Sequence, residues 1–174
     1  KVNSLNKLFQ FFDANNSDSA MKIGEQALKL ANKIGYSLGQ AGANNNLGTI
    51  YFYKGNITKS LQCYLNAAQA LENDKSGSSK QIFFRKQLSS TYNNIGTIYL
   101  RQKLYDEAEK YFYKSIKIDR DINDKIGMSH SYNNIGTIKE EVNKYDEAIK
   151  NYEIALELKK EANDTDGIAS TLIN

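Results

Sequence analysis

Residues 92–98 read Tyr-Asn-Asn-Ile-Gly-Thr-Ile, and residues 132–138 repeat these seven letters without a change. Residues 44–50 read Asn-Asn-Asn-Leu-Gly-Thr-Ile, which is nearly the same heptapeptide. Measured between their glycines, the copies are 48 and 40 residues apart; these glycines are Gly48, Gly96 and Gly136. A recurring spacing of this length predicts an array of similar structural units that stack on one another.

A second pattern follows each copy at constant offsets. A small residue stands 12 positions after the glycine, an aromatic residue 16 positions after it, and another small residue 19 positions after it. These residues are Ser60, Tyr64 and Ala67, then Ala108, Phe112 and Ser115, and then Ala148, Tyr152 and Ala155. Glycine inside a helix costs about 1 kcal/mol relative to alanine, which is tolerable where a second helix must approach closely. If these glycines lie inside helices, a second helix that packs closely at the glycine would account for their use.

The combined pattern resembles the tetratricopeptide repeat family, whose unit is a helix, a tight turn and a second antiparallel helix. The resemblance covers nearly the whole chain and implies an all-α fold, namely a right-handed solenoid of antiparallel helix pairs. The sequence departs from the family pattern at a few places. They are Lys139 where an aromatic residue is usual, Ser60 and Ser115 where alanine is usual, and Asn44 where a bulky residue is usual.

The repeats define the expected organisation of the 174-residue chain, which contains no proline. We expect a single domain over residues 1–174. Its repeats would cover approximately 1–36, 37–76, 80–124 and 127–163, with a partial repeat at 167–174. The expected helices are 2–12, 19–34, 37–53, 56–73, 82–100, 105–121, 127–142 and 145–162. Because the partial repeat stops inside its first helix, we expect the chain to be a fragment of a longer protein.

Composition and charge restrict the classes of partner. The formal net charge is +3, which is too small to favour a nucleic-acid ligand. No apolar stretch reaches the roughly 18 residues that a membrane-spanning helix needs, and no signal peptide is recognisable. We therefore expect no nucleic-acid partner, no membrane contact by this segment and a cytoplasmic location.

No catalytic, metal or cofactor motif is recognisable. His130 is the only histidine, and no cysteine or second histidine stands at the spacing of a zinc ligand set. Residues 119–124 resemble the opening of a calcium loop. However, this stretch has no glycine at its sixth place and has His130 at its twelfth, where a glutamate is required. We interpret residues 119–124 as a turn between helices. The segment is thus expected to have no enzymatic activity and no cofactor, and a catalytic domain would lie outside it.

Paired asparagines before the repeat glycines are the strongest candidate binding residues. Asparagine is a poor helix former, so three such pairs inside helices require a reason. The resemblance implies that this part of the first helix faces a concave groove. Kinesin light chain repeats, which are similar, carry Asn-Asn here and use it to hold peptide ligands. A carboxamide both donates and accepts, so it can clamp an extended backbone. Alternatively, these amides bond to each other or to neighbouring turns and fix the stacking of repeats.

The predicted peptide site extends from these asparagines along the same helices. The repeated threonines lie about one helical turn further on, and residues that differ between repeats would set selectivity. His130 lies near the start of a first helix, on the same expected surface. The full set is Asn45, Asn46, Thr49, Tyr53, Asn93, Asn94, Thr97, Arg101, His130, Asn133, Asn134, Thr137 and Glu141.

Three functions remain open at this point. The first is a scaffold that binds a peptide or a partner protein in the groove. The second is a regulatory or sensor segment of a larger bacterial signal-transduction protein, because similar arrays are joined to histidine kinases, nucleotide cyclases and transcription regulators. The third is self-association, as a homodimer, through the open ends of the solenoid.

Overall fold

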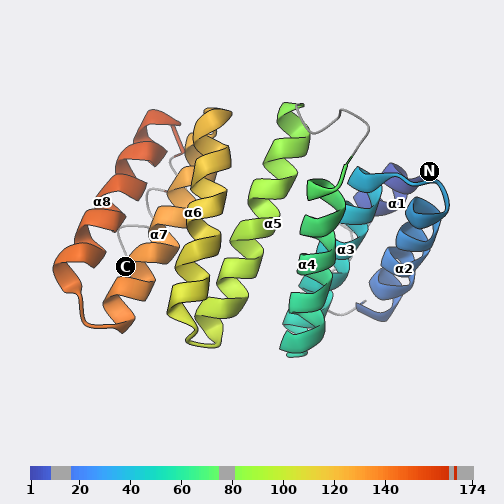
Figure 1. Ribbon diagram of the computed structural model, residues 1–174, viewed down its shortest axis with the longest axis horizontal. Helices are drawn as coiled ribbons and strands as arrows, with labels where there is room; N and C mark the ends of the chain where they lie inside the picture. Colours follow the sequence, from blue (N-terminus) through green and yellow to red (C-terminus); the bar gives the residue numbers. More distant parts are fainter. Residues whose placement is uncertain (9–16, 75–80, 165–166, 168–174) are drawn as a thin grey trace. The chain divides into compact units, whose positions relative to one another are not determined.

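The computed structural model describes residues 1–8, 17–74, 81–164 and 167, and these residues form α-helices and no strand (Figure 1). The predicted all-α fold is therefore confirmed. The helices are α1 Val2–Leu8, α2 Ser17–Lys33, α3 Ser37–Tyr53, α4 Ile57–Glu72, α5 Ile82–Arg101, α6 Tyr105–Asp121, α7 Lys125–Glu141 and α8 Tyr145–Glu161. Residues 9–12 of the first expected helix, most of the loop before α5 and residues 168–174 lie outside the described part of the chain.

The turns within and between helix pairs share one backbone geometry. Two residues after the end of a helix, the chain enters the left-handed region, as at Gly35 (φ 64°), Gly55 (φ 74°) and Asn123 (φ 55°). Glycine and asparagine tolerate this conformation better than other residues do. After α3, the Asn56 amide then donates to the Tyr51 carbonyl at 2.8 Å, which is the hydrogen bond of a Schellman motif. This compact ending allows the next helix to start after only a few residues and to run antiparallel.

The described chain divides into two compact units, residues 1–91 and residues 92–174, with the boundary inside α5. In the first unit, α1 packs on α2 and α3, α2 packs on α3, and α3 packs on α4. In the second unit, α6 packs on α7 and α7 packs on α8. The sequence analysis expects one domain over the same stretch, and the structure describes that stretch as these two units.

The core of the first unit consists of small and large apolar side chains from α2, α3, α4 and the N-terminal part of α5. The N-terminal part of α5 adds Phe84, 3% exposed, to a cluster that contains Leu71 from α4 and Ala41 from α3. A second cluster contains Leu47 and Ile50 on α3 and the small Ala20 on α2. Burying one such large side chain contributes about 1.5–3 kcal/mol to the free energy of folding. These contacts therefore hold α2, α3, α4 and the N-terminal part of α5 together within the unit.

Close approach at the repeat glycines is confirmed in both units. A Cβ atom on Gly96 would lie 2.6 Å from the Phe112 ring, and one on Gly136 would lie 2.6 Å from the Tyr152 ring. In the first unit, a Cβ atom on Gly48 would lie 2.8 Å from the Tyr64 ring. In each pair, therefore, the aromatic residue 16 positions downstream occupies the space that the missing side chain leaves.

Candidate functional site

The asparagine pair of the first unit is hydrogen-bonded to the neighbouring first helices. Asn45 on α3 donates from Nδ2 to Thr91 Oγ1 on α5 at 2.9 Å, and the Thr91 hydroxyl donates to the Gln87 carbonyl at 2.7 Å. Asn46 donates from Nδ2 to the backbone carbonyl of Asn6 on α1 at 3.4 Å. Asn45 therefore links α3 to α5, and Asn46 links α3 to α1.

The second unit repeats this arrangement between α5 and α7. Asn93 donates from Nδ2 to Ser131 Oγ at 2.8 Å, and its Oδ1 accepts from Asn134 Nδ2 at 3.3 Å. Asn94 makes no side-chain hydrogen bond with the described residues of its unit, although it is half-buried. A carboxamide has two N–H donors and two acceptor lone pairs, so one bond between helices leaves capacity for a ligand.

The repeated threonines point their hydroxyls back into their own repeat. Thr49 lies 3.0 Å from both the Asn45 carbonyl and the Tyr64 hydroxyl. Thr97 donates to the Asn93 carbonyl at 3.0 Å. Burial raises the pKa of the Tyr64 hydroxyl, so the phenol stays protonated at neutral pH and remains a donor.

Thr137 has the same environment in the last described pair. It donates to the Asn133 carbonyl at 3.2 Å and lies 3.3 Å from the Tyr152 hydroxyl, which donates to Glu140 at 2.9 Å. All three threonines are half-buried, and their hydroxyls support the helix pair from inside.

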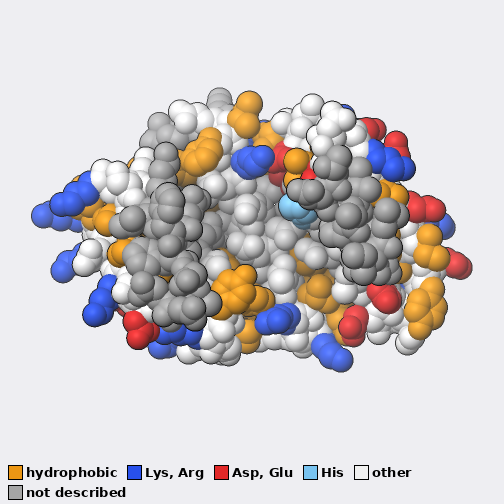
Figure 2. All heavy atoms as spheres, turned by 180° about the vertical axis from the view of Figure 1, so that it is seen from behind, with side chains coloured by type: hydrophobic (Ala, Val, Ile, Leu, Met, Phe, Trp, Pro, Cys, Tyr) orange, Lys and Arg blue, Asp and Glu red, His pale blue; other side chains and the backbone are white. Residues whose placement is uncertain are grey.

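The other predicted site residues are exposed. The Tyr53 side chain at the end of α3 is 80% exposed, and its ring makes an edge-on contact with Phe52. Arg101 ends α5, and His130 lies on α7 with its imidazole at the surface (Figure 2). Glu141 accepts a hydrogen bond from the Tyr105 hydroxyl at 3.3 Å. These side chains are accessible to a partner, as selectivity residues must be.

A cleft of about 540 Å³ lies beside Asn46 in the first unit. Its walls carry amide side chains, two apolar side chains and a glycine, and no ionisable group. The lining residues are Asn3, Asn6, Leu38, Gly42, Asn46, Phe83 and Gln87. Asn6 Oδ1 is buried here and has no hydrogen-bond partner among the described residues. A buried acceptor without a donor is costly, and a donor from outside could reach this oxygen only if the Asn6 carboxamide turned towards the cleft.

Several residues of this region were not among the predicted site residues. Thr91 and Ser131, which receive the asparagine amides, both stand directly before a repeat tyrosine. Because both carry a hydroxyl group at the same position of the repeat, the sequence contained a signal that could have identified them as partners of the asparagines. Asn6, Phe83 and Gln87 lie outside the repeated heptapeptides, so periodicity alone did not indicate them.

The stretch interpreted as a turn rather than a calcium loop does connect two helices. The Asp124 amide donates to the Asp119 carbonyl at 2.8 Å, and Asp124 Oδ1 accepts from the Gly127 amide at 3.1 Å, which caps α7. Within the described residues, no group of three or more potential metal-ligating side chains is found. None of the described helices combines the length and the apolar character that crossing a membrane requires.

Two sequence-family models match the chain, and both describe the tetratricopeptide repeat. One matches residues 41–73 and the other residues 87–161. The comparison with curated protein sequences gives no match.

Solved structures with the same fold include the following three proteins. BtubC (BKLC) from P. vanneervenii is 16% identical over 89% of this chain, with a TM-score of 0.72. The apo form of RapI is 18% identical over 90% of the chain, with a TM-score of 0.75. Aspartyl phosphate phosphatase F from Bacillus subtilis is 19% identical over 86% of the chain, with a TM-score of 0.71. The chain spans 62%, 54% and 38% of the lengths of these proteins, respectively.

Proposed function

Because the chain belongs to the tetratricopeptide repeat family, we propose that it is a protein-interaction scaffold that binds a peptide or partner protein along the first helices of its pairs. In the first unit these are α1, α3 and the N-terminal part of α5. In the second unit they are the remainder of α5 and α7.

The observation that carries this proposal is the cleft beside Asn46. Its amide groups match the alternating donors and acceptors of an extended peptide backbone. Asn6 Oδ1 is buried, so the Asn6 carboxamide would rotate to receive a backbone N–H. Phe83, which is 60% exposed, and Leu38 offer apolar contacts to one ligand side chain. A charged ligand side chain would find no opposite charge on the lining residues, so the cleft favours an uncharged segment.

The second unit contributes an amide that is available for the same role. Asn94 has no side-chain hydrogen bond with the described residues of that unit, whereas its neighbour Asn93 is committed to Ser131 and Asn134. One residue of this pair would thus hold the repeats together while the other holds ligand. Arg101 and Glu141, both exposed, would add selectivity for charged ligand residues near that unit.

The proposal is tested with a peptide selected from a phage-displayed random library against the whole chain. The selected peptide is then synthesised, and its dissociation constant is measured by calorimetry for the wild type and for Phe83→Ala. We expect Phe83→Ala to weaken binding about tenfold, the loss typical of an apolar contact of 1.4 kcal/mol.

A neighbouring residue supplies the matched control. Ile82 is 67% exposed on the same helical turn and does not line the cleft, so Ile82→Ala should bind the peptide with wild-type affinity. Circular dichroism should show the same helix content in both variants. If Phe83→Ala binds as tightly as Ile82→Ala, the cleft is not the peptide site.

A regulatory or sensor segment of a larger signalling protein is the second candidate function. What favours it is that the fold is shared with aspartyl phosphate phosphatase F, of which this chain spans only 38%. In that case the catalytic or output domain would be encoded beside this segment. The sequence of the gene on both sides of the segment tests this, because an uninterrupted repeat array without another domain would contradict it.

A further inference from the structure

One repeat position differs in chemistry between the two units. Asn44 in the first unit stands where the following copies carry Tyr92 and Tyr132. In the second unit, the ring of Tyr92 is 8% exposed and its centroid lies 5.9 Å from that of Tyr111. Tyr111 in turn stacks on Tyr99, with 5.6 Å between centroids. Aromatic rings therefore fill the space between the two helices of that pair.

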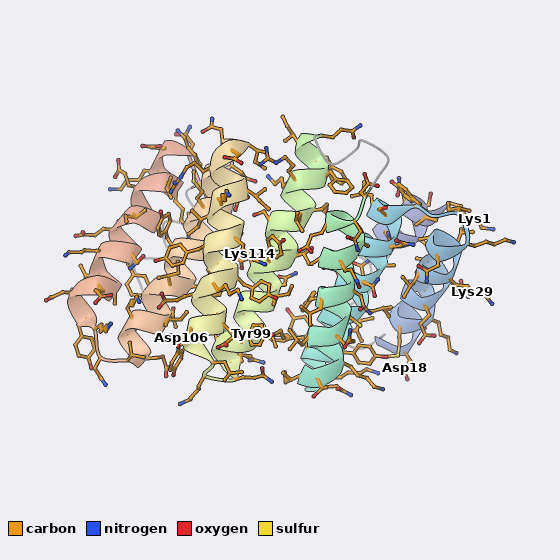
Figure 3. The ribbon with its side chains drawn as sticks, in the orientation of Figure 1. Lys1, Asp18, Lys29, Tyr99, Asp106 and Lys114 are labelled. Carbon is orange, nitrogen blue, oxygen red and sulfur yellow. The ribbon has the colours of Figure 1, made fainter. Side chains whose placement is uncertain are left out.

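A lysine covers this aromatic cluster. The Lys114 ammonium group lies 5.0 Å from the Tyr92 ring centroid and 4.9 Å from the Tyr111 ring centroid, within the range of cation–π contacts. Figure 3 shows Lys114 on α6 and Tyr99 on α5. In the second unit, therefore, the space between α5 and α6 accommodates two phenol rings with an ammonium group above them.

The corresponding residues of the first unit, 48 positions earlier, are Asn44, Cys63 and Asn66. Neither a ring nor an ammonium group is present at these three positions. Asn44 donates from Nδ2 to the Gln40 carbonyl on its own helix at 3.0 Å. Its Oδ1 makes no hydrogen bond with a described residue and is not sealed off from solvent. An acceptor is therefore available where Tyr92 places a ring in the second unit.

A cleft of about 500 Å³ is present here, between α2, α3 and α4. It is lined by six carboxamide side chains, one hydroxyl, two apolar side chains and one glycine, and by no ionisable group. The lining residues are Leu28, Asn32, Gly35, Ser37, Gln40, Asn44, Asn66, Gln69, Ala70 and Asn73. Ligand pockets of proteins commonly have volumes of about 300–1,000 Å³.

We propose that this cleft, which we term the Asn44 cleft, receives a tyrosine side chain from an uncharged segment of a partner protein. The second unit shows that a phenol ring fits this position of the repeat. Leu28 and Ala70 would contact the ring, and the carboxamides would bond its hydroxyl and the backbone on either side. Tyrosine combines apolar area with a polar tip and is a frequent anchor of protein interfaces. A charged anchor would remain unpaired in this cleft.

The Asn44 cleft is separate from the cleft proposed above for peptide binding. Gln40 and Asn44 line the former, whereas Gly42 and Asn46 line the latter. Residues two apart on a helix point about 200° away from each other, so the two clefts lie on opposite sides of α3. Either can be disabled by mutation without altering the lining of the other.

The probe for the test is N-acetyl-tyrosinamide, titrated into the ¹⁵N-labelled chain and followed by NMR. We expect half-saturation in the millimolar range for so small a ligand. The largest shifts should be those of the side-chain amides of Asn44, Asn66 and Gln69. N-acetyl-alaninamide, which has the same backbone and no ring, should produce no saturable shift. Equal responses to the two probes would overturn the proposal.

Asn44→Tyr is the decisive variant, because it places in the first unit the ring that the second unit already contains. It should weaken probe binding about tenfold or more and raise the thermal midpoint. A variant that keeps wild-type affinity would show that the ring binds elsewhere.

A second variant keeps the test valid if Asn44→Tyr does not fold. Asn66 and Gln69 are exposed on α4, so Asn66→Ala/Gln69→Ala should retain wild-type helix content and bind the probe several-fold more weakly. Thr58→Ala, an exposed change on the same helix away from the cleft, should leave affinity unchanged. Equal affinities for these two variants would overturn the proposal.

Discussion

Lys139 Nζ on α7 lies 2.6 Å from Glu109 Oε1 on α6 and 3.6 Å from Glu147 Oε2 on α8. The Lys139 and Glu109 side chains are only 15% and 23% exposed. The hydrogen bond that Lys139 donates to Glu109 raises the pKa of Lys139, so the lysine is charged at neutral pH. In the first unit the corresponding residues are Tyr51 and Met21, which pack against one apolar cluster. An apolar contact between consecutive pairs has thus been replaced by an ion pair.

This replacement predicts a strong coupling between residues 109 and 139. Glu109→Met and Lys139→Tyr should each lower the free energy of unfolding by about 1–2 kcal/mol, because each leaves a half-buried charge without its main partner. The double variant restores the residue types of the first unit and should regain most of that loss. Urea denaturation of the four proteins measures the coupling. Strictly additive effects would mean that the pair is not energetically linked.

Gly96 is predicted to tolerate no larger residue. Gly96→Leu should lower the free energy of unfolding by about 2–3 kcal/mol through overpacking, because a Cβ atom there already meets the buried Phe112 ring at 2.6 Å. Thermal denaturation measures the effect. Gly96→Ala/Phe112→Leu, which removes part of the ring, should be more stable than Gly96→Ala alone. An unchanged thermal midpoint for Gly96→Leu would contradict the packing seen here.

Asn93 and Asn94 are adjacent, which allows stacking and ligand binding to be separated. Asn93→Ala removes the hydrogen bonds to Ser131 and Asn134 and should lower the free energy of unfolding by about 1–2 kcal/mol. Asn94→Ala removes no bond within its unit and should leave stability nearly unchanged while weakening the binding of a library-selected peptide that contacts the second unit. Chemical denaturation and calorimetry measure the two effects. Equal losses of stability would show that both asparagines are structural.

Asp18 lies on α2 (Figure 3). It accepts a hydrogen bond from Lys54 at 2.6 Å, and this pair makes stability depend on pH. The hydrogen bond and charge of Lys54 lower the pKa of Asp18 below its ordinary value of 3.8. The stabilising contribution is therefore present above pH 3.8 and is lost as the pH falls through the lowered pKa. Asp18→Asn should be less stable than the wild type at neutral pH, and the difference should diminish as the pH falls through the lowered pKa of Asp18.

Salt provides the control for this pair, because exposed charges are screened at about 1 M ionic strength. The difference between Asp18→Asn and the wild type should shrink under that condition. A difference that persists unchanged in acid and in high salt would assign the effect to something other than the ion pair.

Exposed apolar side chains on α8 predict self-association. Tyr145 and Ile149, one helical turn apart on α8, are 59% and 54% exposed, and clustered apolar surface of this kind commonly forms contacts. Sedimentation velocity should show a dimer that increases with protein concentration. Ile149→Glu, which introduces the residue type of Glu109 at the same repeat position, should shift the chain towards monomer. A wild type that sediments as a monomer at every concentration would refute this prediction.

Periodicity alone predicted the helices within a few residues at their ends, and it also predicted the close contacts at Gly96 and Gly136. Helix boundaries depend on residues nearby in the sequence. The offset of 16 residues from each repeat glycine to an aromatic residue indicates where two helices come into contact. The partners of the asparagines could not be derived in this way. Both alternatives, stacking and peptide binding, required the same residue type at the same place, and only the position of Ser131 relative to Asn93 distinguishes them.

The sequence by itself thus determined the all-α fold, the pairing of helices and the positions where a side chain had to be absent, because residue types at constant spacing match the pattern of the tetratricopeptide repeat. The tertiary structure alone decided how departures from the repeat are accommodated. Lys139 meets Glu109 from the preceding pair, whereas Asn44 is accompanied by no compensating ring and borders a cleft. The physical reason is that a residue that departs from the repeat is surrounded by side chains of other helices. These side chains come into contact with it only when the helices pack.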